Sequence, residues 1–196
     1  MAKAALPKTG TSTGTSTVVS LKVTLRDTKP PIWRRLLMAD AMTLADVHEA
    51  VQGAMGWHDA HLHLFDIDGR QYGDPRTVDD VADERRLTLR GLLKSGVLRF
   101  AYIYDFGDSW EHVIAIEKAR SAVDGETLPA CIAGKRACPP EDCGGTWGYE
   151  HLIEVLADPS HPEYEEQRDW IVEEIDPEAF DIDLANTVLK AKFGRK

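Results

Sequence analysis

The stretch VLRFAYIYDFGDSWEHVIAIEK, Val97 to Lys118, decides the fold. Two runs rich in aromatic and β-branched residues, Val97–Asp105 and Trp110–Lys118, flank the turn-forming pair Gly107-Asp108. Runs of this composition on either side of a tight turn predict two antiparallel strands joined as a β-hairpin.

The register of this hairpin determines which of its side chains meet. A two-residue loop would pair Asp105 with Trp110 and Ile103 with His112, and alternation would then place Asp105, Trp110 and His112 on one face. Asp105 and His112 would be diagonal neighbours on adjacent strands, with their backbones about 7–8 Å apart, so their side chains could meet. Such a pair could orient a metal-binding imidazole or tune a general base. Alternatively, His112 is a hydrogen-bonded core histidine.

Upstream of the hairpin, the pattern predicts further strands and one helix. VVSLKVTLRD (Val18–Asp27) alternates apolar and polar residues, and IWRRLLM (Ile32–Met38) follows a Pro-Pro break, so both runs predict strands. Thr43 is placed to cap a helix with an apolar stripe. The stripe consists of Leu44, Val47, Val51 and Ala54. His61–Asp68 predicts another strand, residues 74–86 a polar loop, and residues 87–93 a strand or a helical turn.

Downstream, residues 124–148 show no periodicity, and three helices are predicted after them: Tyr149–Asp158, Pro162–Glu174 and Asp183–Phe193. Residues 1–17 are rich in Thr, Ser, Gly and Lys and predict a disordered tail. Residues 18–193 predict a single domain. The fold class that follows is α+β, with a mostly antiparallel β-sheet, one early helix and a helical C-terminal third.

Charge and hydropathy restrict the partners that we expect. The net charge of −10 is concentrated in residues 141–183, which hold 15 acidic residues and the single base Arg168. This acidic segment repels phosphate backbones, so we do not expect nucleic acid as a partner. No apolar run approaches the roughly 18 residues that cross a bilayer, and the N-terminus lacks the apolar core of a signal peptide. We therefore expect a cytoplasmic protein without membrane contact.

Two sets of residues have the chemistry of metal ligands, and zinc is the metal that we would expect them to hold. The first combines three cysteines at the spacing C-x6-C-x4-C with a histidine; its members are Cys131, Cys138, Cys143 and His151. Packed reduced thiols are the alternative for these cysteines. The second set uses two histidines two residues apart in a predicted strand, together with the hairpin pair. Its members are His61, His63, Asp105 and His112. A strand that carries histidines without a metal is the alternative there. No phosphate-binding or dinucleotide motif occurs, so no nucleotide cofactor is expected.

Four strings carry a resemblance to a known family: KPPIWRR (Lys29–Arg35), LADVHEAVQGAMGWHDAHLHLF (Leu44–Phe65), YDFGDSWEH (Tyr104–His112) and CIAGKRACPPEDCGGTWGYEHL (Cys131–Leu152). From about Ser20 to Val188 the chain resembles the plasmid pRiA4b ORF-3-like family of the MM3350-like superfamily. The resemblance implies a compact α+β domain found on plasmids and mobile elements, with undefined biochemical activity. Some members carry a transposon-resolvase label, but the nucleophilic serine amid arginines and the basic helix-turn-helix that such chemistry needs are not evident here.

Our leading hypothesis is a cytoplasmic, non-catalytic binding or interaction module associated with plasmids and mobile elements. An unknown ligand or protein partner would contact aromatic anchors and polar specifiers near the hairpin turn and the cysteine segment. These ligand-binding candidates are Tyr102, Tyr104, Asp105, Asp108, Trp110, His112 and Trp147. One alternative is a metal-dependent hydrolase that uses the second metal set. The other is an accessory protein of DNA recombination or transposition, with Arg34, Arg35, Lys135 and Arg136 as its basic contacts.

Overall fold

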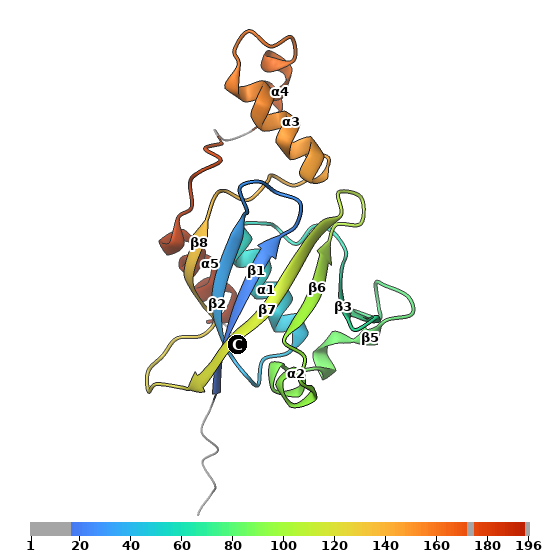
Figure 1. The fold of residues 1–196 in the computed structure, drawn as a ribbon, viewed down its shortest axis with the longest axis vertical. Helices are drawn as coiled ribbons and strands as arrows, with labels where there is room; N and C mark the ends of the chain where they lie inside the picture. The colour runs from blue at the N-terminus through green and yellow to red at the C-terminus, as the bar shows by residue number, and fades with distance from the viewer. Residues whose placement is uncertain (1–16, 172–174, 195–196) are drawn as a thin grey trace, which may run out of the picture.

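A computed structural model describes residues 17–171 and 175–194, and residues 1–16 of the predicted tail lie outside this part of the chain. The predicted α+β fold is confirmed: the described residues form an eight-stranded sheet in the order β5-β4-β3-β6-β7-β1-β2-β8, with α-helices between its strands and after the last one (Figure 1). The strands are β1 (Thr17–Leu25), β2 (Trp33–Ala39), β3 (His63–Ile67), β4 (Arg70–Gly73), β5 (Ala82–Asp83), β6 (Arg99–Tyr104), β7 (Trp110–Ser121) and β8 (Ala130–Lys135). The helices are α1 (Leu44–Met55), α2 (Leu89–Ser95), α3 (Gly145–Ala157), α4 (Tyr164–Trp170) and α5 (Ile182–Phe193), with a 3₁₀ turn, η1, at Glu84–Arg86.

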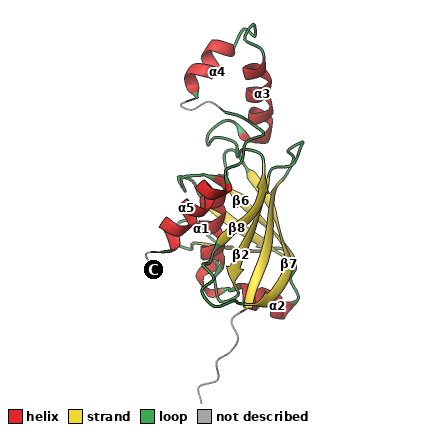
Figure 2. Cartoon of the chain, turned by 90° about the vertical axis from the view of Figure 1, so that its left-hand side faces the viewer, coloured by secondary structure: helices red, strands yellow, loops and turns green. Residues whose placement is uncertain are grey.

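The sheet is mostly antiparallel, as predicted, and only the short pair β4 and β5 runs parallel. β1 lies between β2 and β7 and is buried along most of its length. Its side chains at Val19, Leu21, Val23 and Leu25 are at most 1% exposed. One face of the sheet is covered by α1 and α5 (Figure 2). The apolar surface buried between these two layers is the main source of the stability of the fold.

Helix α1 begins where its sequence predicts. The Thr43 side chain accepts a hydrogen bond from the Asp46 backbone N–H, and the Asp46 carboxylate accepts one from the Thr43 backbone N–H. This reciprocal pair satisfies two backbone donors that the first helical turn leaves open. Gly56 ends the helix in the left-handed conformation, with φ of 97°, which glycine adopts without a steric penalty. The helix therefore holds its buried stripe at a defined position over the sheet.

The register predicted for the hairpin between β6 and β7 is wrong by one residue. Five residues, 105–109, form its loop, so Tyr104 pairs with Trp110 and Tyr102 with His112. Asp105 and Ser109 take left-handed conformations, with φ of 56° and 53°, and the Ser109 N–H donates to the Asp105 carbonyl over 2.6 Å. As a result the four strand residues face the core, each 0% exposed, and Asp105 lies in the loop. Asp105 and His112 are therefore not diagonal neighbours.

Three short elements were missed by the sequence predictions or left open by them. β4 and β8 form in segments for which no strand was predicted, and β8 pairs with β2 inside the segment predicted to be irregular. The ambiguous segment at 87–93 is helical, because Thr88 caps α2 by accepting from the Gly91 N–H and Leu89 and Leu92 are buried. These elements are only four to seven residues long, too short for a periodic pattern to identify.

Helices α3 and α4 form an arm that projects beyond the end of the sheet (Figure 1). α3 begins at Gly145, four residues before the predicted Tyr149, and α4 buries none of its side chains. The predicted end of α4 at Glu174 lies outside the described residues. Across residues 17–171 and 175–194, no helix is long and apolar enough to cross a bilayer.

Candidate functional site

A polar cleft of about 560 Å³ opens between the N-terminal half of α1, the start of β3 and the loop that leads to η1. Histidines, carboxylates and arginines dominate its wall. The charged and histidine side chains that line it are Asp46, His48, Glu49, Asp59, His61, His63, Asp74, Arg76, Glu84 and Arg85. We call it the histidine cleft. It gathers residues from three separate segments of the chain, as ligand sites commonly do.

One side of the floor of the cleft is a chain of hydrogen bonds that starts in the core. The Gln52 amide donates to the Tyr102 hydroxyl over 3.1 Å, and that hydroxyl lies 2.8 Å from His48 Nδ1. His48 Nε2 lies 2.9 Å from Asp59 Oδ1, and the Asp59 backbone N–H donates to the side-chain Oε1 of Gln52 over 3.1 Å. The four side chains therefore form a closed ring of contacts.

This ring fixes the protonation of His48. A backbone N–H can only donate, so the contact with Asp59 identifies the oxygen of the Gln52 amide, and its nitrogen must then donate to Tyr102. The buried Tyr102 hydroxyl keeps its own hydrogen for His48 Nδ1, which accepts it. His48 therefore carries its proton on Nε2 and donates to Asp59. Burial also lowers the pKa of His48, although the bond with Asp59 opposes this.

The other side of the floor is the pair His63 and Glu84. His63 Nε2 lies 2.8 Å from Glu84 Oε2, and the Glu84 side chain is 4% exposed. The His63 ring stacks on the His48 ring, with centroids 3.5 Å apart and an interplanar angle of 7°. We refer to Gln52, Tyr102, His48, Asp59, His63 and Glu84 together as the cleft floor. Within it each carboxylate contacts a histidine, so every charged group has a partner.

Next to the floor, His61 lies between two aspartates from distant segments. Its Nδ1 is 3.6 Å from Asp105 Oδ2, and its Nε2 is 3.3 Å from Asp142 Oδ1. His61 Nε2 is buried and makes no hydrogen bond. One ligand atom from each of the three residues lies within 4.8 Å of the others, and the same holds for His48, Asp59 and His63. We call His61, Asp105 and Asp142 the junction.

The hairpin turn and the cysteine segment meet at the junction, and both are tied to the loop that carries His61. The Gly144 N–H donates to Asp108 Oδ2 over 3.2 Å, and the Asp105 N–H donates to the Leu62 carbonyl over 2.8 Å. The Trp57 indole N–H donates to the Pro139 carbonyl over 3.0 Å. Tyr104 donates to Glu141, and this bond and burial raise the pKa of its hydroxyl.

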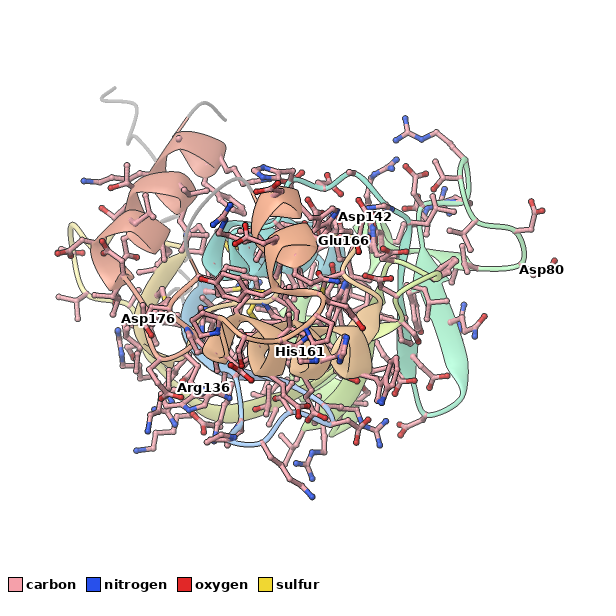
Figure 3. The ribbon with its side chains drawn as sticks, turned by 90° about the horizontal axis from the view of Figure 1, so that it is seen from above. Asp80, Arg136, Asp142, His161, Glu166 and Asp176 are labelled. Atoms are coloured by element: carbon pink, nitrogen blue, oxygen red, sulfur yellow. The ribbon has the colours of Figure 1, made fainter. Side chains whose placement is uncertain are left out.

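Figure 3 looks onto the arm and the end of the sheet from which it projects, and labels Asp142 there.

The second predicted metal set is not assembled. His61 belongs to the junction with Asp105, whereas His63 belongs to the cleft floor. His112 is buried in the core, where Nδ1 contacts the Trp110 carbonyl over 2.9 Å and Nε2 has no partner. Burial lowers the pKa of His112 to about 4. The register change leaves Asp105 in the loop while His112 faces the core. His61 and His63 separate because β3 begins at His63 and His61 lies before it.

The predicted thiolate set is not assembled either among the described residues. The three cysteines are free thiols, and burial raises the pKa of each, that of Cys143 to about 12. His151 lies on the arm, 2.9 Å from Glu163 Oε2. Without a metal, the thiols are therefore protonated at neutral pH.

The predicted aromatic anchors divide into two classes. Tyr102, Tyr104 and Trp110 are fully buried, so they are parts of the core and cannot meet a partner directly. Trp147 is 79% exposed on the arm, where its ring stacks on His151. Of the predicted polar specifiers, Asp105 lies in the junction and Asp108 holds the cysteine segment.

Three of the four predicted DNA contacts are engaged within the protein. Arg34 is 2% exposed and donates to the carbonyls of Ala54, Trp33 and Lys135. Arg35 forms a two-point ion pair with Glu117, at 2.7 and 3.0 Å. Arg136 pairs with Glu178 over 2.8 Å. These three side chains are therefore engaged in contacts within the fold.

Besides Gln52, four histidine or acidic residues of the cleft floor and the junction were missed from the sequence: His48, Asp59, Glu84 and Asp142. His48 gave a usable signal, because it lies beside Val47 and Val51 on the buried stripe of α1, where a polar side chain needs a partner. The other three lie in or beside loops and gave none. All three are brought to the site by contacts across the fold.

Comparison with known proteins identifies the family of the chain. The family model described as plasmid pRiA4b ORF-3-like protein matches residues 17–184. The chain is 40% identical over 153 residues to the uncharacterized protein y4hQ of Sinorhizobium fredii (strain NBRC 101917 / NGR234), covering 76% of this chain and 78% of that one. It is similar to the crystal structure of MM3350, a protein of unknown function from Methanosarcina mazei Go1, with a TM-score of 0.80 and 37% identity over 86% of this chain and 97% of that one. The chain therefore belongs to the plasmid pRiA4b ORF-3-like family.

Proposed function

We propose that this protein is a non-catalytic binding module that receives a cationic ligand in the histidine cleft. The observation that carries the proposal is the cleft floor, in which His48 and His63 are already bonded to Asp59 and Glu84. A floor whose polar groups have partners before the ligand arrives is rigid, and rigidity lowers the entropy cost of binding.

The hydrogen bonds of His48 argue against its use as a general base. A general base must present a free nitrogen lone pair to its substrate. The Nδ1 lone pair of His48 accepts from the buried Tyr102 hydroxyl, and its Nε2 hydrogen points to Asp59. Neither nitrogen is therefore available to a molecule in the cleft.

The charge of the wall supports a cationic ligand. Five carboxylates line the cleft, against two guanidinium groups, those of Arg76 and Arg85. Both guanidinium groups lie 2.5 Å from Asp74, which lowers the pKa of that carboxyl. The arginines are therefore held by one carboxylate, and Lys192 pairs with Glu49 over 2.8 Å. The remaining acidic side chains, Asp46, Asp59 and Glu84, set the sign of the field in the cleft.

A pair of organic cations, spermidine and agmatine, tests the proposal by isothermal titration and thermal shift. We expect at least one of them to bind and to raise the melting temperature, and citrate and phosphate to do neither. Asp59→Asn removes a cleft charge and keeps an oxygen for His48, so we expect it to weaken binding at least fivefold. Asp80→Asn is the matched control, because Asp80 is also an aspartate with positive φ, 57°, outside the cleft. Binding of anions alone, or equal binding by the Asp59 variant, would contradict the proposal.

We also propose that the module works in the cytoplasm alongside plasmid-borne genes. The plasmid name of its family supports the association, and three free thiols fit a reducing compartment.

A further inference from the structure

We propose that the junction is a divalent-metal site, in which His61, Asp105 and Asp142 bind an ion of the Mn²⁺ class. The inference rests on the proposed preference of the cleft for cations, and it adds a separate inorganic site at its edge. Its ligands come from the loop before β3, the hairpin turn and the cysteine segment. The site differs from both metal sets that the sequence suggested.

The first step is the state of the His61 ring. Its contacts with the two aspartates, 3.3 and 3.6 Å, are longer than the 2.7–3.2 Å of a hydrogen bond. The buried Nε2 has no hydrogen-bond partner at all. A buried nitrogen without a partner costs about 1–3 kcal/mol, so something in the working protein is expected to satisfy it.

The second step is the geometry of the three ligand atoms. Bonds of about 2.0–2.2 Å place the ligands of one transition-metal ion about 3–3.5 Å apart. One ring nitrogen of His61 and one oxygen of each aspartate lie within 4.8 Å of one another, so no pair needs to close by more than about 1–2 Å to reach that spacing. Asp142 can make this movement, because its side chain is 70% exposed and forms no hydrogen bond among the described residues.

The third step is that the other two ligands are held in place. Asp105 is 7% exposed, and its Oδ1 accepts from the Gly107 N–H over 2.9 Å. This bond orients the carboxylate and leaves Oδ2 facing His61. The loop of His61 is joined to Asp105 through the backbone bond at Leu62. Oriented ligands with supporting hydrogen bonds are what metal sites require.

The cleft floor, which also contains three possible ligands, is the competing location. There, Nε2 of His48 carries a hydrogen that points to Asp59, and Nδ1 is occupied by Tyr102. A metal on His48 would force the proton to Nδ1 and leave the buried Tyr102 hydroxyl without an acceptor. A metal at the junction displaces no such hydrogen bond. The hydrogen bonds that determine the protonation of His48 therefore favour His61 as the metal ligand.

The ligand set also indicates the class of ion. One imidazole and two carboxylates suit Mn²⁺ or Zn²⁺, whereas thiolates select softer ions. Mn²⁺ is the better probe, because it binds poorly to the three free thiols and its free form gives a paramagnetic resonance signal that disappears on binding.

The test is a Mn²⁺ titration of the full chain after treatment with a chelator, followed by electron paramagnetic resonance. We expect one ion per chain. We expect His61→Gln and Asp142→Asn to weaken binding at least tenfold. Asp80→Asn, a change of an exposed aspartate with nearly the same φ as Asp142, 57° against 61°, should bind as the wild type does.

His63→Gln separates the two locations, since it removes a possible ligand of the floor and none of the junction. Wild-type affinity in this variant supports the junction. Equal loss in His63→Gln, or wild-type affinity in both His61→Gln and Asp142→Asn, would overturn the inference. Because Asp142 is an exposed loop residue, its variant should fold normally. Failure of Mn²⁺ to bind, with spermidine or agmatine still bound, would reject the metal site and leave the proposed function in place.

Discussion

In the cleft floor, both ring nitrogens of His48 lie within 2.9 Å of a partner, whereas the ring of His61 in the junction approaches no aspartate closer than 3.3 Å. The two places use the same residue types, and His61 of the junction lines the same cleft as His48, Asp59, His63 and Glu84 of the floor. In the floor, closed hydrogen bonds contribute to the stability of the fold. In the junction, the His61 ring has a buried nitrogen without a hydrogen-bond partner, as expected of a ligand site without its ligand.

Composition and proximity alone therefore do not decide whether a group of histidines and carboxylates is a metal site. Both groups satisfy a distance criterion for metal ligands. What separates them is where each hydrogen must be, and in the floor this follows from a single backbone N–H, that of Asp59.

Breaking the junction at its backbone should have the largest effect. Gly145 has φ of 70°, and a Cβ there would lie 2.5 Å from the Asp108 carbonyl oxygen. Gly145→Ala should lower the free energy of unfolding by about 4 kcal/mol, since the left-handed conformation costs about 1–2 and overpacking about 1–3. Denaturant unfolding measures it. Gly125→Ala is the control, with φ of 80° and open space around its Cβ. A loss in Gly145→Ala no larger than in Gly125→Ala would mean that the contact between the two loops contributes nothing.

Acid should lower the free energy of unfolding through His112, which is buried beside Tyr102 of the cleft floor. His112, whose ring centroid is 5.4 Å from that of Tyr102, has its pKa lowered by burial to about 4, below the unfolded value of about 6.5. Between these values the unfolded chain binds more protons, so stability is present above pH 6.5 and is lost as the pH falls toward 4. The loss is about 3 kcal/mol at about 1.4 kcal/mol per unit. Unfolding curves from pH 7 to 4 measure it, and His112→Phe should flatten the profile. An unchanged slope in that variant would assign the acid sensitivity to other groups.

Opening the ring of the floor from inside should cost less. Tyr102→Phe removes the hydroxyl that accepts from Gln52 and donates to His48. Two buried polar groups then lack a partner, so the free energy of unfolding should fall by about 2 kcal/mol. Tyr72→Phe, at a half-buried tyrosine on β4, should stay within about 0.5 kcal/mol. Equal small losses in the two variants would show that the ring in the floor is not closed in solution.

Much of the fold could be predicted because its long elements repeat a pattern. The alternation of Val18–Asp27 and the stripe that runs from Leu44 to Ala54 both persist over about ten residues, and β1 and α1 form there. The hairpin could be predicted, but its register could not. Alternation shows which residues share a face, whereas the length of the loop depends on the left-handed conformations of Asp105 and Ser109, which no period records.

The candidate site was harder, for a related reason. His61 and Asp105 were recognised as chemically interesting, but their partner Asp142 reaches them through a hydrogen bond between Asp108 and Gly144, a contact across 36 positions of the chain. His48 was overlooked because the apolar residues around it on α1 indicated only a core-facing stripe. A buried polar residue on such a stripe is the signal that could have found the floor.

The smallest expected change is the most direct test of the comparison. His61→Gln should alter the free energy of unfolding by less than about 0.5 kcal/mol in metal-free buffer, because the ring makes no hydrogen bond to lose. His48→Gln, at a ring with two bonds, should cost about 2 kcal/mol. With Mn²⁺ present, the wild type and His48→Gln should gain stability, because binding to the folded state stabilises that state. His61→Gln should gain none, because it lacks the ligand nitrogen. A loss of about 2 kcal/mol in metal-free His61→Gln would mean that the junction is as closed as the floor, and the distinction between them would fall.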